Sequence, residues 1–555
     1  MAGGLMNISA YGNENIILHG NPKKTFFKAS YNKHTNFGLQ RFRINYKGTR
    51  TLNPNQKSIF NFKIPRYGDL IHDTYIVIDL PNIWSPFYFK SDNHEIAPKY
   101  EMIPYEFQWI KDLGSSMIDE VLITSGGVEL SKISGEYLSV QSQRDLNTEK
   151  KALWDAMTGN VPTLYNPSNV NNNLGVYPNA FYLNNDDIEP SIRGRKLYIP
   201  INSFFCNNSK LALPLVALQY QEIEVRIIFK PLYDLFTIND IKYEDMDNTG
   251  LSYRIRANPN DIDQQMYRFL QPPKQQIANA QSYSIPDDGV GNFWNPDIHL
   301  ISTFIFLDES ERRLLAQGEH RYLIKEIIQH DFLGQSGSKT VNIESRNLIS
   351  SYMYRFRRSD VNLRNEWHNY SNWAYEDIVP QNISLNLLNN ALNKIDGLNN
   401  PNNFYITGNI GNFAANKKEI LQDLAISMGG VYRENQMDAG IYNYVEKYLR
   451  TSGNAKNGLY CYNFCLNSNI DEYQPSGGMN VNKFKYVSFE FNTIECPNSE
   501  NQKLSDLICD NMGNPLGFRK TINTLKEYTF DLRVWEERYN MIIIKSGRIG
   551  LLNAK

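Results

Sequence analysis

The chain has 555 residues, with 57 Lys and Arg against 59 Asp and Glu, so its formal net charge is -2. This near-neutral balance argues against a protein that coats nucleic acid by charge alone. Hydrophobic residues at 41% and charged residues at 21% argue against a largely disordered chain. At about 150 residues per domain, the length predicts three to four domains, or two if they are rich in β-structure.

The unusual feature of the composition is its aromatic content. The chain contains 35 Tyr, 28 Phe and 7 Trp, and asparagine is also abundant. Aromatic side chains favour pleated strands, and asparagine favours turns and left-handed backbone positions. The composition therefore predicts a large, turn-rich β protein and excludes coiled coils and helical bundles.

Neither a secretory signal nor a membrane-spanning helix is expected. Residues 1–9 lack a positively charged region followed by an apolar stretch, and no run of about 18 apolar residues occurs. Five cysteines are too few, and odd in number, for a disulfide framework. We therefore expect reduced thiols in a chain that folds in the cytosol, at Cys206, Cys461, Cys465, Cys496 and Cys509.

The Gly/Asn-rich residues 1–26 predict an N-terminal arm. After residue 26, patterns typical of strands dominate the sequence. β-Branched and aromatic residues fill 74–80. Residues 121–130 predict a hairpin that turns at Gly126-Gly127. Residues 222–227 alternate charged and apolar side chains, which is typical of a strand with one wet face. Because no regular helical crossovers separate these runs, two packed antiparallel sheets are favoured over a parallel α/β sheet.

Changes in composition predict loops and insertions between the strands. Residues 160–190 predict a long loop, and residues 231–290 predict a linker with an insertion. A polar insertion is expected at about 393–457. Long loops are tolerated because the entropy of closing them rises slowly with length.

Helices are expected at three places. The clearest begins at Asp308, which can cap the helix while Glu311 reaches back, as in a capping box. Two others are expected near 417–428 and 439–449. Both precede glycine signals that are typical of a helix end, at Gly429-Gly430 and Gly453.

A search for chemistry finds two weak candidates. Residues 334–340 (Gly-Gln-Ser-Gly-Ser-Lys-Thr) lack the spacing of a phosphate-binding loop, so a polar turn between strands is favoured. Cys461 and Cys465 resemble half of a metal site, but no second pair of ligands follows at a suitable spacing. On a strand these two thiols share one face and Tyr460, Tyr462 and Phe464 share the other, so packed, inert thiols are the better interpretation.

Other catalytic patterns are missing. The eight histidines are scattered without an H-E-x-x-H motif, and no G-x-S-x-G motif occurs. The acidic pairs Asp186-Asp187, Asp287-Asp288 and Glu536-Glu537 are no indication of a glycosidase, whose two carboxylates face each other across a cleft. We expect no catalytic residue, no cofactor-binding residue, no metal ligand and no enzymatic activity.

Residues 352–358 (Tyr-Met-Tyr-Arg-Phe-Arg-Arg) admit two interpretations. On a strand, Tyr352, Tyr354 and Phe356 line one face, and Arg355 and Arg357 line the other. This arrangement suits a stacking platform for single-stranded nucleic acid. It also suits an aromatic core face with a basic side that is solvated or faces another subunit, and the near-neutral charge favours this second interpretation.

The sequence resembles the major capsid proteins of the nucleocytoplasmic large DNA viruses, in order along nearly the whole chain. Leu18-His19-Gly20-Asn21-Pro22 and His34-Thr35-Asn36-Phe37 are similar to that family's N-terminal signature. Further similar motifs are Gly3-Gly4-Leu5-Met6, Thr25-Phe26-Phe27-Lys28, 211–220, 306–313, Arg357-Arg358-Ser359-Asp360, Arg364-Asn365-Glu366-Trp367, 458–460, 474–477, Arg538-Tyr539-Asn540-Met541 and Ser546-Gly547. The residues after Gly477 depart from the family pattern, and the insertions look longer than in compact members.

The resemblance implies an all-β fold of two tandem eight-stranded jelly rolls, here residues 27–230 and 291–555, with long loops and a few short helices. It implies a structural protein that forms homotrimers, and hence pseudo-hexagonal capsomers that tile an icosahedral shell. The implied location is the virion, after synthesis and assembly in the host cytoplasm. The implied partners are other copies, minor capsid proteins under the shell and, as a further candidate, an internal membrane, without direct contact to the genome.

Three alternatives stay open at this point. One is a double-jelly-roll scaffold that shapes a membrane during assembly and is then discarded. The others are a lectin-like β-sandwich and a glycan-active enzyme, because jelly rolls also carry sugar-binding sites. Glycosylation sequons occur at Asn7, Asn207, Asn369 and Asn382, but cytosolic folding would keep them unmodified.

Overall fold

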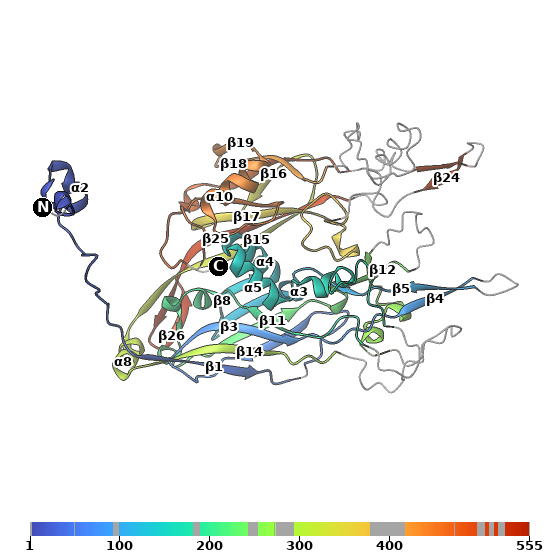
Figure 1. The fold of residues 1–555 in the computed structure, drawn as a ribbon, viewed down its shortest axis with the longest axis horizontal. Helices are drawn as coiled ribbons and strands as arrows, with labels where there is room; N and C mark the ends of the chain where they lie inside the picture. Colours follow the sequence, from blue (N-terminus) through green and yellow to red (C-terminus); the bar gives the residue numbers. More distant parts are fainter. Residues whose placement is uncertain are drawn as a thin grey trace.

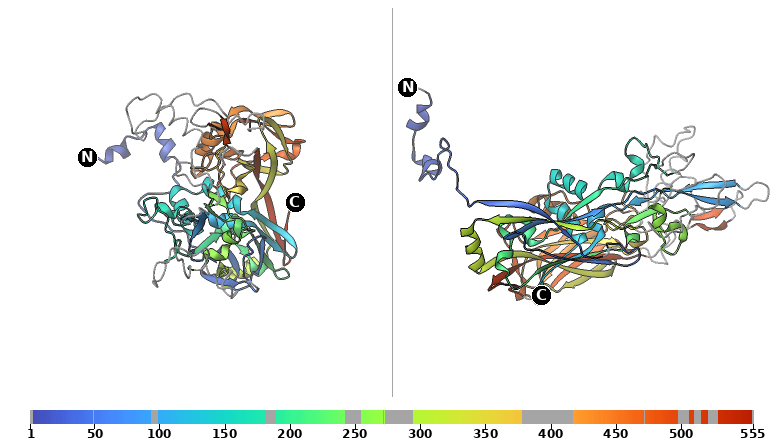
Figure 2. Two further views of the ribbon diagram at one scale, coloured as in Figure 1. Left: turned by 90° about the vertical axis from the view of Figure 1, so that its right-hand side faces the viewer. Right: turned by 90° about the horizontal axis from the view of Figure 1, so that it is seen from below.

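Two β-sandwiches lie side by side, one above the other in Figure 1, and their strands run roughly along the long axis of the molecule (Figures 1 and 2). An N-terminal arm leaves one end, and small sheets with β4 (Phe87–Asp92), β5 (Lys99–Pro104), β12 (Phe236–Asn239) and β24 (Pro515–Arg519) lie at the opposite end (Figure 1). The computed structural model describes residues 3–48, 50–92, 99–180, 189–241, 254–270, 272, 294–377, 417–470, 472–496, 506–509, 515–519 and 528–553.

The first sandwich packs a five-stranded sheet against a four-stranded one. The five-stranded sheet has the order β1-β14-β3-β10, with β9 also paired to β3, and the second has the order β2-β11-β7-β8. Every pairing is antiparallel. The strands are β1 (Phe37–Asn45), β14 (His299–Leu307), β3 (Leu70–Asp79), β10 (Leu213–Pro214), β9 (Lys196–Pro200), β2 (Ser58–Lys63), β11 (Ile223–Phe229), β7 (Ile118–Ser125) and β8 (Val128–Ser134).

Three strand predictions in this sandwich are confirmed. Strand β3 covers residues 74–79 of the predicted run. Strand β11 buries alternate residues, so Ile223, Val225 and Ile227 enter the core while the charged side chains between them stay exposed. The predicted hairpin joins β7 to β8, and Gly126 and Gly127 adopt φ of 56° and 82°, which side chains with a Cβ rarely tolerate.

Strand β14 crosses the expected division of the chain. Its residues 299–307 lie in the range that was expected to form the second jelly roll. They pair instead with β1 and β3 of the first sandwich, in a continuous register from Phe37–Leu307 to Asn45–His299. The first sandwich is therefore completed only after residue 299.

The second sandwich consists of residues from β15 onward. One sheet has the order β15-β25-β17-β20, with β21 on β17 and β26 on β25, and the other has the order β16-β22-β18-β19. Its strands are β15 (His320–Gln335), β25 (Phe530–Lys545), β17 (Leu348–Arg358), β20 (Leu459–Asn463), β21 (Met479–Asn480), β26 (Arg548–Leu551), β16 (Ser338–Ile343), β22 (Val487–Thr493), β18 (Leu421–Met428) and β19 (Val431–Asp438). Tyr352, Tyr354, Phe356, Phe489 and Phe491 form an aromatic core between these sheets.

The helix predicted near 417–428 is wrong, because residues 421–428 form strand β18 between β19 and β22. Gly429 and Gly430, at φ of 59° and 87°, make the hairpin turn to β19 and do not end a helix. Most of the described part of the expected insertion at 393–457 thus belongs to the sheet or packs on it, and residues 393–416 lie outside the described residues.

The other two predicted helices are confirmed. Helix α8 (Glu309–Gln317) follows Asp308, although the Asp308 side chain accepts a hydrogen bond from Ser310 Oγ (2.9 Å) and caps no backbone N–H among the described residues. The helix expected at 439–449 begins with the π-helical turn η11 (Ile441–Val445) and continues as α10 (Glu446–Arg450).

Three helices of the first sandwich follow its strands. They are α3 (Leu113–Met117), α4 (Gly135–Asp145) and α5 (Thr148–Thr158). Ser134 and Asn147 cap α4 and α5 by accepting from the N–H groups of Tyr137 and Lys150. All residues of α4 are buried, and the helix lies between the two sandwiches (Figure 1).

The end opposite to the arm carries three small sheets and several short helices. The expected linker at 231–290 contributes β12 and β13, and Phe236 and Phe269 are fully buried, so its described part is packed.

The remaining described elements, from all parts of the chain, are β6 (Gln108–Trp109), β13 (Arg254–Arg256), β23 (Asp506–Cys509), α1 (Leu5–Ser9), η1 (Asn13–Asn15), α2 (Ile16–His19), α6 (Pro162–Tyr165), η2 (Pro167–Asn169), α7 (Phe204–Asn207), η3 (Ser209–Leu211), η4 (Leu215–Ala217), η5 (Leu232–Asp234), η6 (Ile262–Gln264), η7 (Met266–Phe269), η8 (Val361–Leu363) and η12 (Val481–Lys483).

In the part of the chain that the structure describes, no helix has the length and apolar character needed to cross a membrane.

Candidate functional site

The cysteines that suggested a metal half-site are packed in the protein interior. Cys461 lies on β20 with Tyr460 and Tyr462 on the opposite face, as the alternation predicted. Burial raises the pKa of Cys461 to about 11 and that of Cys206 to about 12, so both thiols stay protonated at neutral pH. Among the described residues, no group of three or more His, Cys, Asp or Glu side chains is placed to hold a metal ion. The Cys509 side chain lies outside the described residues.

The glycine-rich segment at 334–340 is a turn between two strands, as predicted. It joins the end of β15 to the start of β16, and Gly334 and Gly337 adopt φ of 70° and 66°. A phosphate-binding loop would instead lead from a strand into a helix.

The side chains of the acidic pair Glu536-Glu537 point to opposite faces of strand β25. Glu536 points into the second sandwich, where it accepts from Ser345 Oγ (2.7 Å) and lies 3.2 Å from His330 Nε2. Glu537 points the other way, toward the first sandwich. The two carboxylates therefore cannot face each other across a cleft as a glycosidase requires. The pairs at 186–187 and 287–288 lie outside the described residues.

The strand at 352–358 separates aromatic and basic side chains, and the aromatic half of the prediction is confirmed. The basic half is wrong: Arg355 and Arg357 are neither solvated nor free to face another subunit. Arg355 is 1% exposed, and its Nε donates to Glu136 Oε1 on α4 of the first sandwich at 2.8 Å. Arg357 Nη1 lies 3.4 Å from the same carboxylate oxygen.

Glu136 is the centre of this first ion cluster. A third guanidinium, that of Arg533 on β25, also donates to it and bonds Asp331 on β15 at 2.5 Å. Burial alone would raise the pKa of Glu136, but the three arginines hold that pKa well below its usual range. The carboxylate is therefore ionised wherever the two sandwiches are docked.

A second ion cluster lies at the other end of α4. The Arg144 side chain is fully buried and bonds Asp145 Oδ1 at 2.7 Å and Glu537 Oε1 of the second sandwich at 2.8 Å. Tyr137 and Ser351 donate hydroxyl hydrogen bonds to Glu537 at 2.7 and 2.8 Å. Burial would raise the pKa of Glu537, but Arg144 lowers it. Since a buried charge without its partner is costly, each cluster favours the docking that keeps its charges paired.

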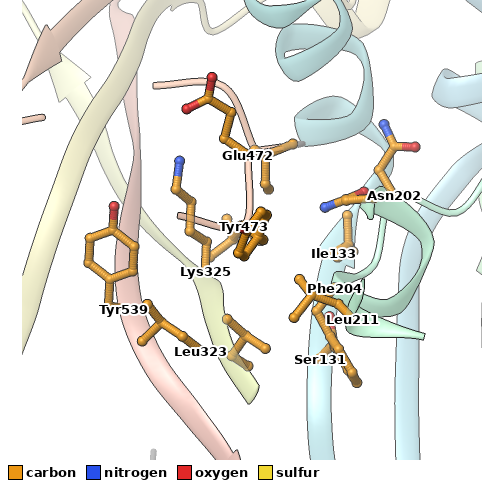
Figure 3. Close-up of a pocket in the computed structure, with 14 residues that line it drawn as sticks. Ser131, Ile133, Asn202, Phe204, Leu211, Leu323, Lys325, Glu472, Tyr473 and Tyr539 are labelled. Atoms are coloured by element: carbon orange, nitrogen blue, oxygen red, sulfur yellow. The ribbon is translucent and has the colours of Figure 1, made fainter. Parts of the chain in front are cut away.

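The seam between the sandwiches leaves a small cavity close to these clusters (Figure 3). Ser131 and Ile133 of β8 line it from the first sandwich, and Leu323 and Lys325 of β15 line it from the second. Its volume of about 20 Å³ has room for about one water molecule. Lys325 Nζ donates to the Ser468 carbonyl at 2.9 Å. The cavity is far smaller than the sites that hold small-molecule substrates.

The sequons differ in their accessibility. Asn369 is 1% exposed and donates to the Trp373 carbonyl at 2.8 Å, so a glycan cannot be attached to it in the folded protein. Asn207 is half-buried in α7, and Asn7 is exposed in the arm. Asn382 lies outside the described residues.

Sequence reasoning missed α4 and its two ion clusters. The local signals for the helices were present, because Ser134 and Asn147 are good N-caps and Gly159 follows α5 at a φ of 82°. The pairing of Glu136 with Arg355 had no local signal, since 219 residues separate them.

Comparisons with known proteins agree with this architecture. Residues 25–259 match a family model described as the major capsid protein N-terminus. The probable capsid protein 4 of Acanthamoeba polyphaga mimivirus is 24% identical over 541 residues, which cover 88% of this chain and 92% of that protein. The major capsid protein of Phaeocystis pouchetii virus is 22% identical over 600 residues, which cover 99% of both chains.

A solved structure shows the same fold. A chain of the quasi-atomic model of the PBCV-1 virus capsid matches with a TM-score of 0.57 at 17% identity, over 96% of this chain and all of that one (100%). The fold is therefore a double jelly roll like that of the matched capsid chain, and residues 25–259 match the capsid family model. The chain is similar to major capsid proteins of large DNA viruses over nearly its whole length.

Proposed function

We propose that this chain is a structural subunit that forms homotrimers, in which six jelly rolls make a pseudo-hexagonal capsomer of an icosahedral shell. The observation that carries the proposal is the docking of the two sandwiches by the buried Glu136 and Arg144 clusters. When the two jelly rolls of each chain are held at a fixed angle, three chains can present six jelly rolls at regular spacing. The clusters supply that rigidity, since breaking either one leaves unpaired buried charge.

An exposed apolar stripe supports self-association. It runs along the helix of η11 and α10, where apolar residues recur at helical spacing and are between 36% and 88% exposed. Its members are Ile441, Tyr444, Val445, Tyr448 and Leu449. Contiguous exposed apolar side chains, and aromatic ones above all, are typical of protein interfaces.

The strand pairing supports a proposed division into domains. We propose an arm up to residue 36, a first jelly roll at 37–307, and a second jelly roll from residue 320 onward, with α8 as the connection. Strand β14 supports this division because it completes the first sandwich. The end opposite to the arm, which carries β4, β5 and β24, would then form the outer surface of the shell (Figure 1).

The same proposal covers partners and chemistry. The protein acts without enzymatic activity, assembles in the host cytoplasm as a late product, and meets minor capsid proteins and an internal membrane beneath the shell. Buried, protonated thiols suit folding in a reducing compartment. No direct contact with the genome is proposed, since the basic strand face at Arg355 and Arg357 is used inside the chain.

Light scattering on the purified protein tests the assembly. We expect a trimer of about 193 kDa, three times the chain mass of 64.2 kDa. A monomer under the same conditions would contradict the proposal. Quantifying the chain in purified mature particles separates a permanent shell protein, which is abundant there, from a scaffold that is discarded.

A further inference from the structure

The N-terminal arm, residues 3–36, presents apolar side chains to solvent. Ten large apolar residues of the arm are each at least 49% exposed, and Phe27 reaches 98%. They are Leu5, Met6, Ile8, Tyr11, Ile16, Ile17, Leu18, Phe26, Phe27 and Tyr31. All hydrogen bonds formed by these described residues stay within the arm, and the arm projects away from both sandwiches (Figures 1 and 2).

The arm also carries more basic than acidic side chains. Lys23, Lys24, Lys28 and Lys33 follow the apolar helices α1 and α2, and Glu14 is the one acidic residue in the described arm. The arm is therefore clearly cationic, although the whole chain carries a net charge of -2. An apolar segment next to a lysine cluster is the combination that holds proteins on anionic lipid surfaces, where either signal alone is weak.

We propose that the arm inserts its apolar helices into an anionic lipid bilayer while its four lysines contact the headgroups. The inference rests on the proposed function, which places a membrane beneath the shell, and it assigns the contact to these residues. Six of the ten apolar side chains are aliphatic, so they suit hydrocarbon and offer no ring for stacking on nucleic acid bases. Three arms on one trimer would bind together and strengthen the attachment.

The position of the arm suits this contact. The arm joins β1 at Phe37, whose partner Leu307 lies two residues before α8. Helix α8 lies at the end of the molecule opposite to β4, β5 and β24 (Figure 1). All arms of a trimer with parallel chains therefore leave from the same end.

A groove on a second copy suits the arm less well. An open groove of about 1190 Å³ lies on the first sandwich beside the Gly126-Gly127 turn. The charged residues that line it are Arg43, Lys47, Lys63, Arg66, Glu222 and Glu224. Four cations against two carboxylates would repel a cationic arm, and Glu222 is already paired with Lys63.

Vesicle flotation with the full-length protein tests the inference. One set of vesicles is pure phosphatidylcholine, and the other contains about one third phosphatidylserine. We expect binding to the anionic vesicles that weakens as salt rises. Replacing the four arm lysines with Gln should weaken it on the order of 600-fold, at about five-fold per lysine. I17D/L18D should weaken it by at least about 10-fold, because both side chains lose their place in the hydrocarbon.

Matched control variants carry the same changes outside the arm. Lys339, Lys417, Lys483 and Lys485 are exposed on the second sandwich, so their replacement with Gln should leave binding unchanged. Leu333→Asp changes a leucine that is 74% exposed on β15, and it should also bind normally.

Three results would overturn the inference. The first is that the wild type binds both kinds of vesicle equally or binds neither. The second is that the arm variants bind as well as the wild type. The third is that the arm variants dissociate into monomers, which would assign the arm to contacts between copies. Light scattering of the wild type separates the two proposals. A wild-type monomer contradicts the capsomer proposal, whereas vesicle binding decides the role of the arm in either case.

Discussion

Arg355 on β17 of the second sandwich donates its Nε hydrogen bond to Glu136 on α4 of the first, at 2.8 Å and with both side chains buried. Arg357 and Arg533 approach the same carboxylate, so one acidic residue binds three basic ones. Because α4 is buried along its whole length, this cluster lies on the seam between the two jelly rolls and sets their relative orientation.

Glu136→Gln removes the charge that all three arginines share while it keeps the shape of the side chain. We expect this variant to lower the free energy of unfolding by about 3–5 kcal/mol, because it leaves guanidinium groups buried without a counter-charge. Urea unfolding at fixed protein concentration measures the change. The matched control is Glu309→Gln on α8, where Glu309 and Arg313 form an ion pair with both side chains 72% exposed. The control should cost less than about 0.5 kcal/mol, and an equal loss in the two variants would contradict the central role of Glu136.

Acid should destabilise the second jelly roll through Asp360. Burial would raise the pKa of Asp360, but Arg358 and Arg364 lower it to about 2 from an ordinary value of 3.8. A carboxyl group with a lowered pKa contributes its stability above pH 3.8 and loses it as the pH falls to about 2. The difference corresponds to about 2 kcal/mol.

Unfolding measured from pH 5 down to pH 2 checks this expectation in the wild type and in Asp360→Asn. The variant should be less stable at pH 5, and the gap should close as the pH approaches 2, since the wild-type carboxyl is then protonated as well. A gap that stays constant with pH would show that the ionised carboxylate is not the source of the stability.

The local part of the fold could be predicted from the sequence, and β11 shows why. Its charged and apolar residues alternate strictly, so the burial of Ile223, Val225 and Ile227 follows from the period of a strand. Residues 417–428 misled the same reasoning. Their apolar residues at 420, 421, 424, 425 and 428 have helical spacing, but pairing with β19 and β22 outweighed this weak local preference.

The pairings between distant residues could not be predicted. Strand β14 returns to the first sandwich across more than 200 residues from β3, and no pattern within β14 names that partner. Likewise, the sequence separates the aromatic and basic faces of 352–358, but whether the basic face is solvated depends on Glu136, 219 residues away. The local sequence shows which side chains share a face of a strand. It does not show which distant residues cover that face.

Gly135, the first residue of α4, has no room for a side chain. A Cβ there would lie 2.1 Å from the carbonyl oxygens of both Ile118 and Ser115. Gly135→Ala should therefore displace the start of α4 and lower the free energy of unfolding by about 3 kcal/mol or more. Gly550→Ala on β26 is the control, because a Cβ there meets nothing within 4 Å. Chemical unfolding that gives equal stabilities for the two variants would contradict this packing.

Tyr448 lies on the exposed stripe of α10 and is 88% exposed, so in a single chain it contributes little to folding. If this stripe contacts another copy in the trimer, Tyr448→Asp places a charge in that contact, and we expect the trimer to dissociate at least 10-fold more readily, a loss of about 1.4 kcal/mol or more. Light scattering over a dilution series measures this shift, while unfolding of the monomer should change by less than about 0.5 kcal/mol. Leu333→Asp is the matched control, since Leu333 is 74% exposed but lies on β15, outside the stripe. A trimer that tolerates Tyr448→Asp as well as Leu333→Asp would assign the contact to a different face and leave the stripe to another partner of the shell.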